Sequence, residues 1–184
     1  MKKLALILTS ALILSACATD DNTATAEQSA TQPAPQRTRY YESADTQNAI
    51  QYPHSGACRL LRENTAKKGR KILYQCSGAQ ILNTAEAREV LQGMPVSFGS
   101  GGGNAKAYRT TRQAAKRFHT GDEKSCERAF INVLAKMRQT AQKEGHRRIT
   151  DLHSYYDRRP QSGGTFTCEV GSFHGRVVFR ARLQ

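Results

Sequence analysis

The residues with the most specific chemistry in this 184-residue sequence are its cysteines, four of which lie beyond residue 50. No two of them form a Cys-x-x-Cys pair, the spacing that zinc sites commonly use. In an exported protein, an even number of cysteines predicts disulfide bonds instead, and four cysteines allow three connectivities. The spacing alone leaves all three open. The four residues are Cys58, Cys76, Cys126 and Cys168.

Other residues that could do chemistry lack the surroundings that the chemistry needs. The run Gly99–Gly103 continues with Asn104 and lacks the Gly-Lys-Ser/Thr ending, so it predicts a flexible surface loop and not a phosphate loop. Ser172 and His174 lie in Gly-Ser-Phe-His-Gly, which is not a nucleophile elbow. The histidines show no metal-ligand spacing. We therefore expect no catalytic residue, no metal and no cofactor. The histidines are His54, His119, His146, His153 and His174.

The first sixteen residues have the composition of an export signal. Lys2 and Lys3 precede the apolar stretch Leu4–Leu14, which is too short to span a bilayer. The next residues complete Leu-Ser-Ala-Cys at Cys17, which resembles the lipobox of bacterial lipoproteins. The resemblance implies that Cys17 is acylated, becomes the mature N-terminus and attaches the chain to a membrane. An ordinary secretory signal with an accidental cysteine is the alternative.

The sequence around and after this segment predicts where the protein is located and how the chain is divided. Residue 18 is Ala and not Asp, which in similar Gram-negative lipoproteins favours the outer membrane, here with the protein on its periplasmic side. Residues 17–51 are rich in Thr, Ala, Gln and Ser without a hydrophobic period, so they predict a disordered, flexible tether. We therefore expect a signal peptide over 1–16, a lipidated tether over 17–51 and one disulfide-stabilised domain over 52–184.

A long helix between Thr120 and Gly145 is the centre of the predicted domain. Apolar residues recur there at steps of three and four. Thr120 and Glu123 match a capping box, and Gly145 can supply the left-handed C-terminal residue. Such a helix needs a sheet to cover its apolar face. The face consists of Cys126, Phe130, Val133, Met137 and Ala141.

The segments before and after this helix predict the sheet. The first two segments flank a polar stretch and predict a β-hairpin with Leu60 opposite Tyr74, although a short helix over Cys58–Asn64 is an alternative. A short helix is expected from Asn83 to Leu91. In the last segment, small and apolar residues alternate with arginines. The fold class is α+β, with one long helix on a small, largely antiparallel sheet. The expected strands are Cys58–Arg62, Arg70–Cys76, Met94–Phe98, Ile149–Tyr156, Thr165–Val170 and Arg176–Leu183.

Five segments in a fixed order carry a family resemblance: Leu82–Glu89, Val96–Gly99, Asp122–Phe130, Ser154–Tyr156 and Thr165–Cys168. They resemble small secreted bacterial proteins often labelled "excinuclease ATPase subunit" and, more distantly, YbjQ-type proteins and the outer-membrane sensor of the Rcs pathway. The family's cysteines match Cys126 and Cys168, so the resemblance implies that these pair and leaves Cys58 for Cys76. The ATPase label finds no phosphate loop or zinc pair in this sequence. The family brings no established activity.

Positive charge gathers in the C-terminal half. The chain has a net charge of +13, and residues 105–184 hold 17 basic against 7 acidic residues. Arginine can bind phosphate or carboxylate oxygens in pairs, so an anion-binding basic face is expected. A solvated basic surface is the alternative. The candidates are Arg147, Arg148, Arg158, Arg159, Arg176, Arg180 and Arg182.

Together these features predict a non-catalytic lipoprotein that binds another component of the envelope or senses stress there. Its expected partners are the membrane, through the lipid, and anionic envelope components or another envelope protein. Two alternatives remain, an enzyme acting on an envelope polymer and a protein that binds nucleic acid. No recognisable acid pair or nucleophile supports the first, and charge alone suggests the second.

Overall fold

The structure, a computed structural model, describes residues 54–64 and 69–184. All of these residues belong to one unit of the chain, Gln36–Gln184. The predicted signal peptide, the lipidation residue Cys17 and the predicted tether lie outside the described residues. Within the described part, no helix is long and apolar enough to cross a membrane.

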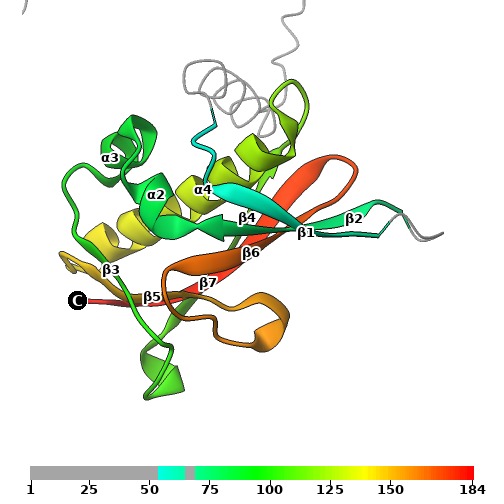
Figure 1. Ribbon diagram of the computed structural model, residues 1–184. Helices are drawn as coiled ribbons and strands as arrows, with labels where there is room; N and C mark the ends of the chain where they lie inside the picture. The colour runs from blue at the N-terminus through cyan, green and yellow to red at the C-terminus, as the bar shows by residue number, and fades with distance from the viewer. Residues whose placement is uncertain (1–53, 65–68) are drawn as a thin grey trace, which may run out of the picture. The chain divides into compact units, whose positions relative to one another are not determined.

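Seven strands form one mixed sheet in the order β1-β2-β6-β7-β5-β3, which β4 joins by pairing with β7 (Figure 1). Strand β7 is central, since it pairs with β4 along one edge and with β6 and then β5 along the other. All neighbouring strands run antiparallel except β3 and β5, which run parallel. The predicted α+β class is confirmed. The strands are β1 (Cys58–Asn64), β2 (Lys71–Ser77), β3 (Val96–Phe98), β4 (Arg109–Lys116), β5 (Ile149–Ser154), β6 (Thr165–Val170) and β7 (His174–Leu183).

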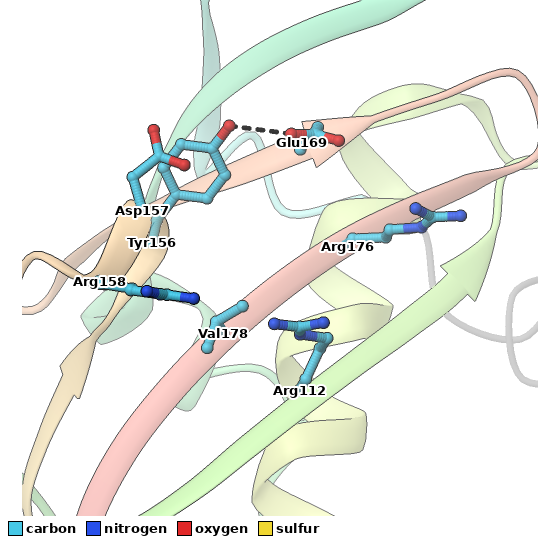
Figure 2. A pocket seen from close by; sticks show the side chains of 7 residues that line it. All are labelled: Arg112, Tyr156, Asp157, Arg158, Glu169, Arg176 and Val178. Atoms are coloured by element: carbon cyan, nitrogen blue, oxygen red, sulfur yellow. Dashed lines mark hydrogen bonds between the residues drawn. The ribbon is translucent and has the colours of Figure 1, made fainter.

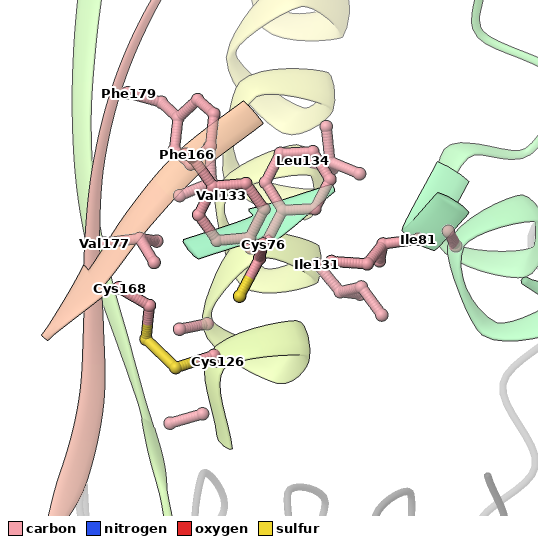
Figure 3. Packing of buried hydrophobic residues seen from close by; sticks show 14 of the residues in the cluster. Cys76, Ile81, Cys126, Ile131, Val133, Leu134, Phe166, Cys168, Val177 and Phe179 are labelled. Atoms are coloured by element: carbon pink, nitrogen blue, oxygen red, sulfur yellow. A yellow bond between two sulfur atoms is a disulfide. The ribbon is translucent and has the colours of Figure 1, made fainter. Parts of the chain in front are cut away.

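The long helix α4 (Gly121–Lys143) packs on the sheet and forms the core with it. Phe130 of the helix lies 4.9 Å from Phe166 of β6 and 4.9 Å from Phe179 of β7, measured between ring centroids. Figure 3 shows Phe166 and Phe179 in the same buried cluster as the disulfide between Cys126 and Cys168. The predicted apolar face is confirmed, since Cys126, Phe130, Val133, Met137 and Ala141 are all buried.

The prediction for the first turn of α4 is wrong, whereas the prediction for its last turn is confirmed. The Thr120 hydroxyl makes no capping hydrogen bond but donates to the Lys116 carbonyl at 3.3 Å. The predicted capping box with Glu123 is therefore wrong, because the hydroxyl is turned back toward the preceding strand. At the other end, Gly145 has a φ of 77°, the left-handed conformation that was predicted.

The first two strands form the predicted hairpin, and the alternative helix over Cys58–Asn64 is wrong. Leu60 pairs with Tyr74, and Cys58 pairs with Cys76 at the open end. Disulfides join Cys58 to Cys76 and Cys126 to Cys168, so the predicted pairing is confirmed. The first disulfide closes a hairpin whose two strands are already joined by backbone pairing. The second ties α4 to β6 across the core.

Smaller elements connect these parts. The predicted short helix is α3 (Ala85–Leu91), whose N-terminus is capped by the Thr84 hydroxyl accepting from the Ala87 amide at 3.2 Å. Helix α2 (Gly78–Leu82) and the 3-10 turns η1 (Ala105–Ala107) and η2 (Tyr156–Arg158) were not predicted. Strand β4 was also missed, and β5 ends at Ser154, two residues earlier than expected.

Candidate anion-binding site

The face of the sheet opposite α4 carries the arginines of β7. Val177, Phe179 and Ala181 are buried in the core, whereas Arg176 is exposed and Arg180 and Arg182 are partly covered. The predicted alternation of this strand is therefore confirmed. The side chains on the outer face nevertheless divide into two groups with different surroundings.

The first group surrounds a pocket of about 310 Å³ on the outer face. Strands β4, β6 and β7 form its floor and sides, and the η2 turn closes one side (Figure 2). Val178 of β7 lies between the guanidinium groups of Arg158 and Arg112 in this view. The pocket is lined by Arg112, Tyr156, Asp157, Arg158, Glu169, Arg176 and Val178.

Regular strand pairing positions two of the three arginines in this pocket. Arg112 lies opposite Val178, and Arg176 lies opposite Glu169 of β6. Directly paired residues project to the same face of a sheet, so these side chains meet on the outer side. Arg112 was not among the arginines predicted from the sequence, because it lies on β4, the strand that was not predicted.

The third arginine depends on an unusual turn. Asp157 and Arg158 have φ angles of 51° and 60°, so two successive residues other than glycine adopt the left-handed conformation. Each such residue costs roughly 1–2 kcal/mol relative to the right-handed conformation. Residues of this kind gather at binding sites, where the strain places a side chain that regular structure would not. Here it brings Arg158 over the pocket.

One of the two carboxylates that line the pocket, Glu169, already has partners within the protein. Glu169 accepts a hydrogen bond from the Tyr156 hydroxyl at 2.9 Å and forms an ion pair with Lys71 at 3.1 Å. Burial alone would raise the pKa of Glu169, but the hydrogen bonds from Tyr156 and Lys71 outweigh it and lower that pKa. Glu169 is therefore ionised at neutral pH and shares its charge with Lys71.

The three pocket arginines, in contrast, have no such close contacts, although Arg176 lies near enough to Glu169 to help lower the pKa of that carboxyl group. Within residues 54–64 and 69–184, the guanidinium groups of Arg112, Arg158 and Arg176 make no hydrogen bond and no ion pair. These three cations face two carboxylates, Asp157 and Glu169, and Glu169 is already held by Tyr156 and Lys71, so the lining of the pocket keeps a net positive charge. Guanidinium groups bind phosphate and carboxylate oxygens through charge-assisted hydrogen bonds, so the pocket is suited to an anionic group.

The second group on the outer face holds the glycine-rich loop. Arg180 donates to the Ala105 carbonyl at 3.0 Å and lies over the Tyr155 ring at 4.7 Å. Arg182 donates to the Gly102 carbonyl at 3.0 Å and to the Tyr108 hydroxyl at 3.2 Å. Both predicted anion-binding residues therefore have protein acceptors, and their guanidinium groups hold the loop against the sheet.

Asp151 completes this second group. It accepts hydrogen bonds from the Tyr108 hydroxyl and, at 3.2 Å, from the Gly101 amide. Burial would raise the pKa of Asp151, but these hydrogen bonds and the neighbouring Arg182 lower it. A side chain on Gly99 would place its Cβ 1.6 Å from an Asp151 carboxylate oxygen, so the loop needs glycine there.

The remaining predicted arginines lie away from the pocket. Arg147 and Arg148 are exposed beyond α4, where their backbone amides donate to the Gln184 carbonyl at 2.6 and 2.7 Å. Arg159 is exposed directly after the η2 turn but does not line the pocket. Of the seven predicted arginines, only Arg158 and Arg176 line the pocket.

Two further findings concern possible metal ligands and similarity to known proteins. Among the described residues, no group of three His, Cys, Asp or Glu side chains could hold a metal ion. The resemblance of the segments between Leu82 and Cys168 to secreted bacterial proteins stays a prediction. Comparison with protein families, with curated proteins and with solved structures found no match to this chain.

Proposed function

We propose that the protein is a non-catalytic lipoprotein, anchored through Cys17 to the periplasmic side of a bacterial outer membrane. In this proposal it binds an envelope component that carries a phosphate or carboxylate group. The group enters the pocket formed by Arg112, Arg158 and Arg176. The observation that carries the proposal is that these three guanidinium groups surround one pocket and make no hydrogen bond to an acceptor among the described residues.

The titratable groups favour binding over catalysis. A carboxyl group that acts as a general acid at neutral pH needs a raised pKa. The pKa values of Glu169 and Asp151 are lowered instead, in each case by hydrogen bonds that outweigh burial. Both carboxylates also have fixed donors within the protein. They are therefore suited to positioning side chains around the pocket and the loop.

Replacing Arg158 by glycine tests the pocket with little risk to the fold. Glycine suits the φ of 60° at this position, so the turn should keep its shape or become more stable. Charge-assisted hydrogen bonds contribute roughly 1.5–3 kcal/mol each. We therefore expect Arg158→Gly to weaken binding roughly 10- to 100-fold.

The measurement is a calorimetric titration with pyrophosphate at roughly 0.15 M salt, where long-range charge effects are screened. The mature lipoprotein is held in phosphatidylcholine nanodiscs. Arg159→Gln is the matched control, because it removes the same charge one residue away without touching the pocket. Equal affinities of wild type and Arg158→Gly would contradict the proposed site.

A further inference from the structure

Two exposed phenylalanines meet at one end of the sheet. Phe118 lies in the loop between β4 and α4, and Phe173 lies in the turn between β6 and β7. They are 56% and 60% exposed, and their ring centroids are 5.8 Å apart. We propose that this pair inserts into the lipid surface to which Cys17 anchors the chain, and so fixes the orientation of the domain on the membrane.

The aromatic pair is held in place before any partner binds. The Arg117 backbone amide donates to the Phe173 carbonyl at 3.0 Å, and the Arg117 guanidinium donates to the Ser172 carbonyl at 3.0 Å. One residue therefore ties the two loops together. Because the loops are already ordered, little conformational entropy is lost when the rings enter a lipid surface.

Two arginines lie beside the rings. Arg117 and Arg70 form ion pairs with the same carboxylate, that of Asp122, at 2.9 and 2.8 Å. Two guanidinium groups thus share one negative charge. Both arginines are about one-third exposed, so they can also reach phosphate oxygens outside the protein. Exposed aromatic rings flanked by basic side chains fit an anionic bilayer surface, where the rings are buried and the arginines meet headgroups.

The described part of the chain begins at the same end of the domain. His54, the first described residue, lies 3.6 Å from Glu123 in the first turn of α4. Ser55 donates to Glu127 through both its amide and its hydroxyl, each at 2.6 Å. The described chain therefore begins beside the loop that carries Phe118, and the proposed anchor precedes this point in the sequence. This step rests on the proposed anchorage.

The proposed orientation leaves the anion-binding pocket open. Val178 lies five residues after Phe173 along the chain, mostly within β7, which corresponds to roughly 17 Å of extended strand. Arg176, the lining residue nearest to Phe173 along β7, lies three residues after it, or roughly 10 Å of extended strand. With the phenylalanines in the lipid surface, the pocket would begin beside the headgroups and extend away from the membrane. The membrane contact and the pocket would then act at the same time.

The sequence allows a specific probe, because it contains no tryptophan. Phe173→Trp therefore introduces a single fluorophore at the proposed contact. Gln184→Trp is the control, since β7 places this exposed residue roughly 35 Å away at the other end of the strand. The mature chain is coupled through the Cys17 thiol to a maleimide lipid in vesicles of phosphatidylcholine and phosphatidylglycerol, so that attachment does not depend on lipidation in cells.

We expect brominated lipids to quench the introduced tryptophan in Phe173→Trp several-fold more than the one in Gln184→Trp, together with a blue shift of its emission. Adding Phe118→Ser should reduce that difference. Equal, weak quenching at both positions would overturn the proposal, and so would a blue shift that occurs without vesicles, since it would assign the surface to a second copy. Arg158→Gly should leave the quenching unchanged, so failure of this contact and failure of the pocket are distinguishable.

Discussion

Replacing both Cys126 and Cys168 by alanine is expected to lower the free energy of unfolding by roughly 4 kcal/mol, from the entropy of the closed loop. The two residues are 42 apart in sequence, and both are fully buried. Their bond joins the first turns of α4 to β6 beside the stacked phenylalanines. Typical domains have only about 5–15 kcal/mol of stability, so this loss would leave a large unfolded fraction.

Urea denaturation of the variant and the wild type measures this effect directly. The control is the variant in which Cys58 and Cys76 are both alanine. Their sequence separation is 18, for which the same estimate gives roughly 3 kcal/mol. The ladder between β1 and β2 already restrains these residues, so the measured loss should be smaller still. A smaller loss for Cys126 and Cys168 than for this control would contradict the central place of the α4–β6 connection.

The second large effect is expected from Cys17→Ala, which should abolish membrane attachment or leave an unprocessed precursor. The reason is that, in the proposed lipobox, the Cys17 thiol is the group that would receive the lipid. Fractionation of cells after a carbonate wash measures the attachment. Ala18→Asp is the matched control: it keeps Cys17 and should stay in the membrane fraction but shift toward the inner membrane. Wild-type fractionation of Cys17→Ala would refute the anchor.

Elements with a clear hydrophobic period were predicted well. The stripe of α4 and the alternation of β7 depend on which side chains enter the core, and burial enforces that pattern. Strand β4 lacks such a pattern, because Thr111 and Gln113 face the helix side where apolar residues would be expected. Among the described strands, β4 pairs only with β7. Its strand conformation therefore depends on backbone hydrogen bonds to β7 more than on the burial of apolar side chains. Because β4 was not predicted, Arg112 was not among the predicted site residues.

The surroundings of Arg180 and Arg182 could not be predicted for a different physical reason. Periodicity correctly placed Arg176, Arg180 and Arg182 on one side of β7, but it could not predict what would cover them. The contacts of Arg180 with Ala105 and of Arg182 with Gly102 join residues about 75 to 80 apart in sequence. Such tertiary contacts leave no local pattern. Reversing all three charges would therefore disturb the loop as well as the basic face.

The most direct test of the central claim is photocrosslinking from the edge of the pocket in living cells. Ala114 is exposed and pairs with Arg176, so a diazirine-bearing amino acid there reaches the pocket without filling it. The account predicts an adduct with an envelope component that persists in Arg159→Gln and is lost in Arg158→Gly. An adduct of equal yield in Arg158→Gly, or none in the wild type, would contradict it.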